Sequence, residues 1–398
     1  MNVNTEYLAD QIYFCDDAKE FEQLVSDNRE IYSDWRGQIV PMLRDRGVKF
    51  KDLSEYCGIK KNTVTNYTSR IPRHREVVIW MAMIMGLSVP QTDELLTRWA
   101  KYHRLYSKSP EDTIWIYLLA RGGSRKPVVL FERYWNAYLD ICREVGEDGI
   151  IPKPDQARAD TQILHRDILE LAEQDPDAAS ADGDFRQFML ERLPIFAMGN
   201  TALLDYVEGL FVQSLECQSG RMLPSELENC RSNRKLTANY LFREDPTFLN
   251  KYYKRRHKMK KYHKLPSRLF LIALGLRLAL PMEEINKLLA LAGMSPLYAK
   301  DRLEGTVIFY LNKLMLYHPA LFFYPDPEER AANAALHNHD LSTPSPAWIL
   351  YDPVKKVPTE RVHDYIKRMV SRTTFLDDEQ LGENSEEKAW KQEFLSYL

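Results

Sequence analysis

The sequence predicts an all-α protein, and three observations carry that prediction. Apolar residues recur three and four positions apart along most of the chain, which is the spacing of one face of an α-helix. Two short stretches of this kind flank Gly58. Features of residues 71–118 return in the same order at residues 265–311. Together these observations predict two related helix-turn-helix domains joined by a helical insert and followed by a Pro-rich C-terminal arm.

The composition is that of a globular protein without a strong charge bias. The chain has 398 residues, enough for two or three domains, of which 44% are hydrophobic and 28% are charged. The formal net charge is -3. A protein that coats nucleic acid non-specifically is strongly basic, so that class is excluded, and any binding to nucleic acid must come from local basic patches.

The cysteines and the apolar stretches indicate a cytoplasmic protein. The five cysteines are odd in number and form no C-x-x-C pair, which predicts reduced thiols at Cys15, Cys57, Cys142, Cys217 and Cys230. Residues 1–13 lack the basic start of a secretory signal. The most apolar stretch, 269–280, contains Arg277 and is too short to cross a bilayer, so we expect a buried helix there and no membrane partner.

The stretch from Leu53 to Tyr67 meets the physical demands of a helix-turn-helix. Small Ser54 lets two helices approach closely, and Gly58 accepts the left-handed conformation of a sharp turn. The shared apolar seam consists of Leu53, Cys57, Ile59, Val64 and Tyr67. The polar residues left to face outward are of the types that bond phosphates and base edges: Lys60, Lys61, Asn62, Thr63, Thr65, Asn66 and Arg70.

The helical pattern continues beyond this motif from Val77 to Met85 and again up to Leu96. Taken together, residues 35–96 resemble the five-helix DNA-binding domain of the lambda-repressor/Cro-like (XRE) family. The resemblance implies that the helix over about residues 60–69 enters the major groove of DNA. The residues that would read bases are Asn62, Thr63 and Asn66, and those that would hold phosphates are Lys60, Lys61 and Arg70. The alternative is a motif kept only for packing or for binding a protein.

A second copy of the domain is predicted from an internal repeat. Leu265 echoes Ile71, Arg268 echoes Arg75, and residues 306–311 echo residues 113–118. By subtraction the offset stays between 192 and 194, as two copies with small insertions would leave it. Chance similarity between apolar helical segments is the alternative.

The second copy departs from the first where a DNA contact would lie. Asp245, followed by a proline, is a good cap for a helix. Aligning Tyr252 with Tyr67 places Arg243, rather than a glycine, at the turn. In that alignment the offset is 185 residues, whereas between Ile71 and Leu265 it is 194. The second copy therefore carries about nine extra residues between these two points.

The extra residues fall in the most basic part of the chain. Residues 251–264 carry eight positive charges and no acid. We expect this copy to add mainly salt-sensitive affinity for the DNA backbone. Its candidate contacts are Thr247, Asn250, Lys251, Lys254, Arg255, Arg256 and Lys258. A solvated helix, a docking face for an acidic protein, and RNA binding through the interleaved tyrosines are the alternatives.

The predicted organisation has five parts. Residues 1–27 form lead-in helices and residues 28–122 the first helix-turn-helix domain. Residues 123–184 form a helical insert that ends in a flexible linker, since residues 175–184 have little to bury. Residues 185–317 form the second, degenerate domain. Residues 318–398 form a Pro-rich arm and an acidic tail, with short helices near 362–370 and 389–398.

No group of residues indicates catalysis. The sequence has no Gly-rich phosphate loop, no H-E-x-x-H and no G-x-S-x-G. His337, His339 and Asp340 are metal-binding residue types, but they are contiguous in a Pro-rich stretch, whereas metal ligands usually come from separate elements. We therefore expect no enzyme activity, no cofactor and no metal.

The sequence thus predicts a cytoplasmic, nucleoid-associated protein that binds specific double-stranded DNA sequences and regulates transcription. Two reading domains in one chain suit an asymmetric site without a homodimer. Monomer and homodimer both stay open. The competing class is a helical adaptor that binds a protein effector through the helix-turn-helix surfaces, and the two classes differ in how binding responds to salt.

Overall fold

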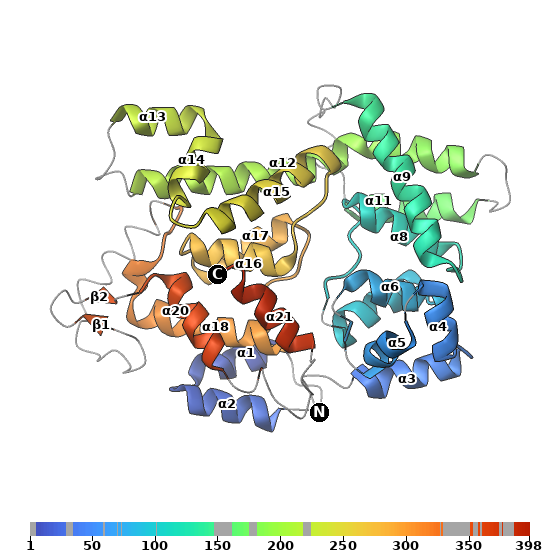
Figure 1. Cartoon of the computed structure of the whole chain (residues 1–398), viewed down its shortest axis with the longest axis horizontal. Coiled ribbons are helices and arrows are strands. Elements are labelled where there is room, and N and C mark those ends of the chain that lie inside the picture. The colour runs from blue at the N-terminus through green and yellow to red at the C-terminus, as the bar shows by residue number, and fades with distance from the viewer. Residues whose placement is uncertain are drawn as a thin grey trace.

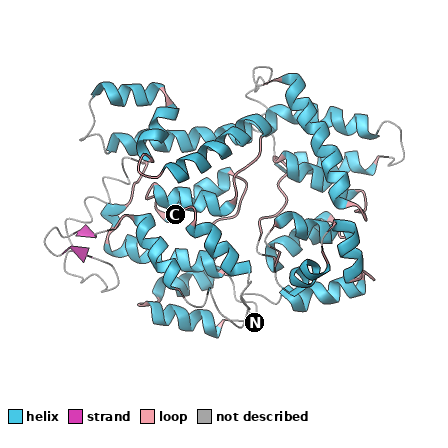
Figure 2. Cartoon of the chain, viewed as in Figure 1, coloured by secondary structure: helices cyan, strands magenta, loops and turns pink. Residues whose placement is uncertain are grey.

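The chain folds almost entirely into helices, which confirms the predicted all-α class (Figure 2). The computed structural model describes residues 5–28, 35–58, 60–69, 71–72, 74–100, 102–146, 161–174, 181–217, 224–326, 328, 351–352, 357–358, 360–373, 376 and 386–398. Within these ranges the only strands are β1 (Tyr351–Asp352) and β2 (Val357–Pro358), which pair antiparallel.

The helices form two lobes that lie side by side in Figure 1. The first lobe contains α3 (Trp35–Asp45), α4 (Phe50–Cys57), α5 (Lys61–Ser69), α6 (Arg75–Ile84), α7 (Val89–Glu94), the π-helical turn η2 (Leu95–Trp99), α8 (Pro110–Ala120), α9 (Pro127–Val145) and α11 (Thr161–Glu173). The second contains α1 (Thr5–Phe14), α2 (Ala18–Asp27), α13 (Pro224–Ser232), α14 (Arg234–Leu241), α15 (Pro246–Tyr262), α16 (Arg268–Arg277), α17 (Met282–Leu291), α18 (Arg302–Tyr317), the 3-10 turn η4 (Pro319–Leu321), α20 (Val362–Arg372) and α21 (Glu386–Leu395).

One long helix, α12 (Ala181–Cys217), belongs to both lobes (Figure 1). Its first half contributes Phe185 and Phe196 to the core of the first lobe, and its second half contributes Leu203 and Phe211 to the core of the second. The division between the cores therefore runs through α12, and not between residues 184 and 185 as the sequence predicts. By length and apolar composition α12 also passes as a possible membrane span, a property that it shares with core helices.

The predicted linker is wrong over its last four residues, because 181–184 form the first turn of α12. Asp182 accepts a hydrogen bond from the hydroxyl of Tyr134 at 2.9 Å and pairs with Arg133 of α9. A carboxylate in the first turn is also favoured by the helix dipole. These contacts with α9 stabilise the start of α12, although its residues have few apolar side chains to bury. The rest of the predicted linker, residues 175–180, lies outside the described residues.

The first and last described helices of the chain pack on the second lobe. Phe21 of α2 stacks on Phe309 of α18, with ring centroids 4.6 Å apart. The two helices of residues 1–27 are thus part of the second core, and do not lead into the first domain. α20 and α21 enter the same core through Ile366 and Phe394. The predicted buried helix over residues 269–280 is confirmed by α16, whose residues Phe270 to Leu276 are all buried.

A buried arginine network occurs twice, at positions 192 or 193 residues apart by subtraction. Arg75, at the start of α6, bonds both carboxylate oxygens of Asp112 in α8 and two backbone carbonyls, those of His103 and Arg104. In the second lobe the same set of bonds joins Arg268 at the start of α16 to Glu304 in α18 and to the carbonyls of Ser295 and Pro296.

The surroundings of the two arginines repeat as well. The carboxylate of Asp112 accepts a bond from the backbone N–H of Tyr106, and that of Glu304 accepts one from Tyr298. α6 and α16 also end alike: Gly86 has a φ of 64° and Ala279, 193 positions later, has a φ of 54°. The same backbone path therefore closes both helices, although only the first has the glycine that this conformation favours.

Candidate nucleic-acid interface

The segment from α4 to α5 forms two short helices joined by a tight turn (Figure 1). Gly58 ends α4 in the left-handed region, with φ 65° and ψ 24°, and its N–H donates to the carbonyl of Ser54. Lys60 then begins α5, since its carbonyl accepts from the N–H groups of Thr63 and Val64. The predicted turn at Gly58 is confirmed.

Apolar side chains hold the two helices together. Leu53, Cys57 and Val64 are buried between α4, α5 and the rest of the lobe, and Tyr67 is half-buried. Ile59, the other residue of the predicted seam, lies outside the described residues. Burial raises the pKa of Cys57 to about 12, so this thiol stays protonated and acts as a small apolar side chain.

One hydrogen bond fixes α5 against a neighbouring helix, and a second lies within α5 itself. The indole Nε1 of Trp35 in α3 donates to the carbonyl of Tyr67 at 2.8 Å, which satisfies a carbonyl in the last turn of α5. The buried hydroxyl of Thr68 donates to the carbonyl of Val64 within the same helix. α5 is thus held at its C-terminal end by Trp35 and on its inner side by the buried Val64.

Three of the residues predicted to contact DNA have described side chains at or next to α5. Lys60 and Thr65 are exposed, and Thr63 is half-buried. Lys61, Asn62 and Asn66 belong to α5, but their side chains lie outside the described residues. Arg70 lies outside the described residues altogether.

The corresponding segment of the second lobe has another shape. α14 and α15 are joined by Phe242 to Asp245 without a left-handed residue, and Asp245 caps α15 by accepting from the N–H of Phe248 at 2.9 Å. The cap is as the sequence predicts. α15 has 17 residues against 9 for α5, so the extra residues of the second copy lengthen this helix.

Three of the seven basic residues on α15 are occupied by contacts within the chain. Lys251 donates to the carbonyl of Ser396 at 2.5 Å, and Arg255 donates to the hydroxyl of Tyr397 at 2.7 Å. Arg256 pairs with the buried Glu208 of α12 at 2.8 Å. These three candidate residues therefore hold the second lobe together.

The other candidates on α15 form an exposed stripe. Thr247, Asn250, Lys254 and Lys258 are exposed, and Lys261 continues the stripe. Their spacing of three or four residues places them on one side of the helix. The sequence analysis missed the role of Tyr397, and no local signal reveals it, because its partners Lys251 and Arg255 are more than 140 positions away.

Candidate metal ligands are not brought together in the part of the chain that the structure describes. Within the described ranges no three His, Cys, Asp or Glu side chains are grouped as a metal site would require. His337, His339 and Asp340 lie outside those ranges.

The chain matches no protein-family model, no curated protein and no solved structure. Its own residues and geometry are therefore the basis for a functional assignment.

Proposed function

We propose that this chain binds specific double-stranded DNA sequences and regulates transcription, with α4 and α5 acting as a helix-turn-helix. The observation that supports the proposal is the turn at Gly58, which sets α5 against α4, with Lys60, just before α5, and Thr65, within it, exposed. An α-helix of this kind fits the major groove, where polar side chains reach base edges.

In this proposal the residues of α5 divide the work. Asn62, Thr63 and Asn66 read bases, because amide and hydroxyl groups bond the donor and acceptor patterns of the groove. Lys60 and Lys61 bind phosphates and fix the position of the helix on the duplex.

The second lobe adds affinity for the DNA backbone through the exposed stripe of α15. Lys254, Lys258 and Lys261 provide three charges on one side of the helix, and each phosphate contact would release counterions. Because Lys251, Arg255 and Arg256 are engaged within the chain, they leave the proposed set of contacts.

The proposal is tested by a gel-shift titration with the best binder selected from a random DNA pool. Replacing Lys60, Lys61 and Asn66 by alanine is expected to weaken binding at least about tenfold and to reduce the slope of log affinity against log salt by about 2. The matched control replaces Lys19, Lys126 and Asn136, which are exposed on other elements, and leaves both quantities unchanged.

Two outcomes would contradict the proposal. Equal affinity of the α5 variant and the control variant would show that α5 does not contact DNA. A salt-resistant complex with a protein, in the absence of any DNA binding, would instead favour the adaptor function.

A further inference from the structure

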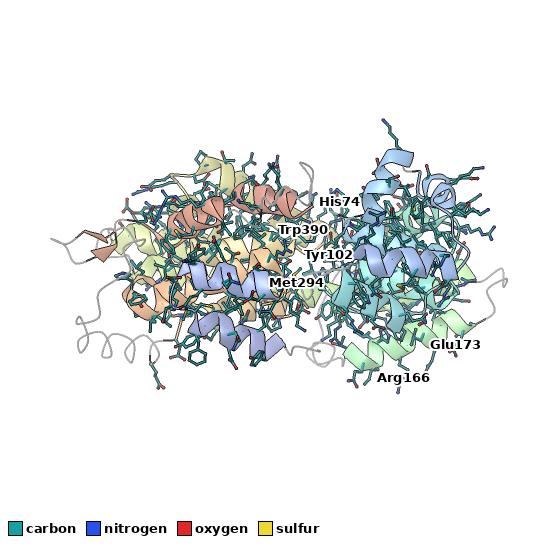
Figure 3. All side chains as sticks on the ribbon, turned by 90° about the horizontal axis from the view of Figure 1, so that it is seen from below. His74, Tyr102, Arg166, Glu173, Met294 and Trp390 are labelled. Carbon is teal, nitrogen blue, oxygen red and sulfur yellow. The ribbon has the colours of Figure 1, made fainter. Side chains whose placement is uncertain are left out.

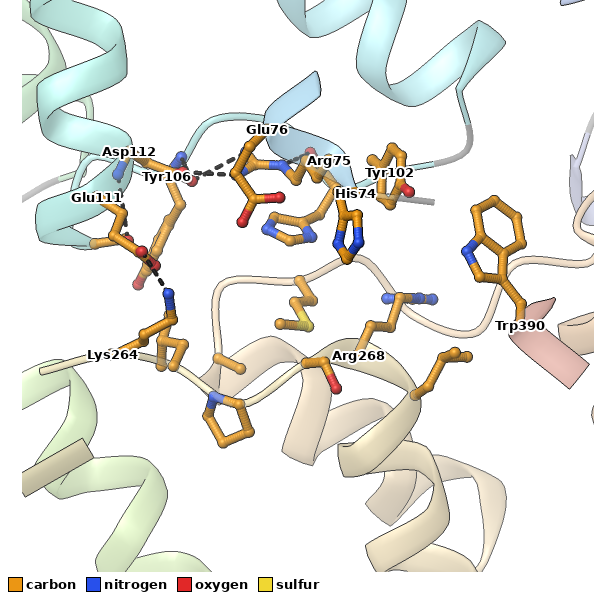
Figure 4. Close-up of a pocket in the computed structure, with 18 of the residues that line it drawn as sticks. His74, Arg75, Glu76, Tyr102, Tyr106, Glu111, Asp112, Lys264, Arg268 and Trp390 are labelled. Carbon is orange, nitrogen blue, oxygen red and sulfur yellow. Dashed lines mark hydrogen bonds and ion pairs between the residues drawn. The ribbon is translucent and has the colours of Figure 1, made fainter. Parts of the chain in front are cut away.

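A cavity of about 320 Å³ lies between the two lobes (Figure 4). Tyr102 and His103, which precede α8, line it from the first lobe, and Met294 and Trp390 line it from the second. Figure 3 shows His74, Tyr102, Met294 and Trp390 gathered where the lobes meet. Small-molecule sites often lie between domains, in cavities of about 300–1,000 Å³, so this cavity has room for a small ligand that contacts both lobes.

This cavity adjoins a second hollow of about 540 Å³ at the same lobe boundary. The walls of the two share Tyr102, His103 and Met294. Arg98 and Arg104, which are exposed, also line the second hollow. The second hollow thus connects the shared wall with solvent and gives a ligand a way in.

The cations that line the cavity are already paired. Arg75 and Arg268 each make four hydrogen bonds to a carboxylate and two carbonyls, and a guanidinium has five N–H groups to donate. Lys264 pairs with Glu111 at 2.7 Å across the lobe boundary. An anionic ligand would have to compete with these carboxylates for the three cations.

The carboxylates that line the cavity have partners within the chain too. Three of them belong to the ion pairs of the three cations. The others are engaged in different ways: Asp301 caps α18, Glu393 accepts from the hydroxyl of Tyr397, and the exposed Glu76 interacts electrostatically with Lys264. A buried ionic ligand would lose its hydration and would compete with these contacts, so the lining favours an uncharged ligand.

Aromatic rings form one wall of the cavity. Tyr102 and Trp390 meet edge to face, with ring centroids 5.8 Å apart and planes at 76°. The hydroxyl of Tyr102 donates to the carbonyl of Pro72 at 2.6 Å, which fixes this ring. Trp390 is half-buried and packs against the cores of both lobes. Fixed aromatic rings favour a flat aromatic ligand, which can stack on them or meet them edge to face.

The imidazole of His103 is a polar group in the shared wall. Burial lowers its pKa well below the usual value, and the positive charges of Arg75 and Arg268 lower it further, so the ring is neutral. A neutral imidazole has one nitrogen that donates and one that accepts. Within the described residues the carbonyl of His103 is bonded to Arg75, whereas its ring makes no hydrogen bond. A ligand that donates or accepts at a ring nitrogen would complete it.

We propose that this cavity binds an uncharged, flat heteroaromatic molecule. Its ring packs against Tyr102 and Trp390, and a ring nitrogen forms a hydrogen bond with the imidazole of His103. Because the site is built from both lobes, the ligand stabilises their contact. The site does not depend on DNA binding, so each proposal stands or fails by itself.

Isothermal titration calorimetry with three probes that share one ring system tests the charge of the ligand. The probes are the neutral indole, the cationic tryptamine and the anionic indole-3-acetate. We expect indole to bind the full chain with a dissociation constant below about 1 mM, and on the order of tenfold more tightly than either ion. Absence of indole binding at about 10 mM, or binding of either ion as tight as that of indole, would overturn the proposal.

Variants then locate the site. His103→Phe keeps a flat ring but removes both ring nitrogens, and is expected to weaken indole binding about tenfold. Trp390→Leu removes part of the aromatic wall and is expected to weaken it by a similar factor. The matched control, His257→Phe at an exposed position of α15, binds indole as the original chain does. A thermal melt of each variant checks that it is folded, and unchanged indole binding by either of the first two variants contradicts the proposal.

Discussion

Replacing Arg268 by methionine is expected to destabilise the second lobe by about 3–5 kcal/mol. The side chains of Arg268 and Glu304 are only 14% and 7% exposed, and their atoms meet at 2.5 Å. Without Arg268, the carboxylate of Glu304 keeps the hydrogen bond from the backbone N–H of Tyr298, which is an uncharged donor. The carbonyls of Ser295 and Pro296 lie near solvent and can bond water, so most of the cost comes from the buried, unpaired carboxylate.

A double replacement separates the charge from the packing. Replacing Glu304 by leucine in the Arg268→Met variant removes the unpaired carboxylate, and two apolar side chains then fill a similar volume. We expect the double variant to regain at least about 2 kcal/mol relative to the Arg268→Met variant, because exchanging a whole buried ion pair for apolar residues is often close to neutral.

Equilibrium unfolding in urea provides the assay, read by two signals. Five of the seven tryptophans pack in the first lobe: Trp35, Trp80, Trp99, Trp115 and Trp135. Tryptophan fluorescence therefore reports mainly on the first lobe, while circular dichroism follows the helices of both. The Arg268→Met variant should move the circular dichroism transition more than the fluorescence transition, and the equivalent Arg75→Met variant should move the fluorescence transition directly.

Two results would refute this reasoning. A cost below about 1 kcal/mol for Arg268→Met would mean that water or a rearranged side chain reaches Glu304 easily. A double variant no more stable than the sum of the two single replacements would mean that the ion pair has no coupling energy, so that its repetition in the two lobes has no energetic importance.

Two further predictions concern the backbone and pH. Gly86→Ala should lower the free energy of unfolding by about 1 kcal/mol and Ala279→Gly should raise it by up to about 1 kcal/mol, because the left-handed region disfavours a Cβ at both positions. Urea unfolding measures both changes, and a loss of stability in Ala279→Gly would contradict this account. His263, bonded to Tyr138 at 2.6 Å, has a pKa that burial lowers to about 4, against about 6.5 when unfolded. The unfolded chain therefore binds the proton more tightly, and stability present above pH 6.5 is lost as the pH falls towards 4, by up to about 3 kcal/mol. His263→Asn, which tolerates the φ of 50°, should lose correspondingly less between pH 7 and pH 4 in denaturant midpoints, and an equal loss would count against this account.

The sequence predicts those parts of the fold that depend on neighbouring residues. The helices, the turn at Gly58 and the cap at Asp245 follow from local spacing and from residues with particular backbone preferences. The repeat can also be seen in the sequence, since Arg75 and Arg268 stand at matching positions. The sequence does not reveal that both arginines bond carbonyls in distant loops.

Contacts between distant segments explain what the sequence does not predict. The positive charges of Lys251 and Arg255 suggest free phosphate-binding groups, yet both are bound by residues near position 397. Likewise, α1 and α2 pack on α18, some 280 residues later, through apolar side chains that would suit many partners equally well. Ala279 adopts a glycine-like conformation with no glycine in the sequence to indicate it.

The two lobes meet through equivalent positions, and this has a consequence for any DNA site. Tyr102 and Met294 are 192 positions apart by subtraction, as are Asp112 and Glu304, and all four line a cavity of about 320 Å³ between the lobes. Such a contact resembles the self-complementary interface of a two-fold dimer, built here within one chain. The symmetry is not exact, because equivalent positions hold Tyr102 in the first lobe and Met294 in the second. The helices α5 and α15 also differ in length. If the chain binds DNA as proposed, α5 alone reads bases, so its site needs no palindrome, whereas a symmetric dimer would require one.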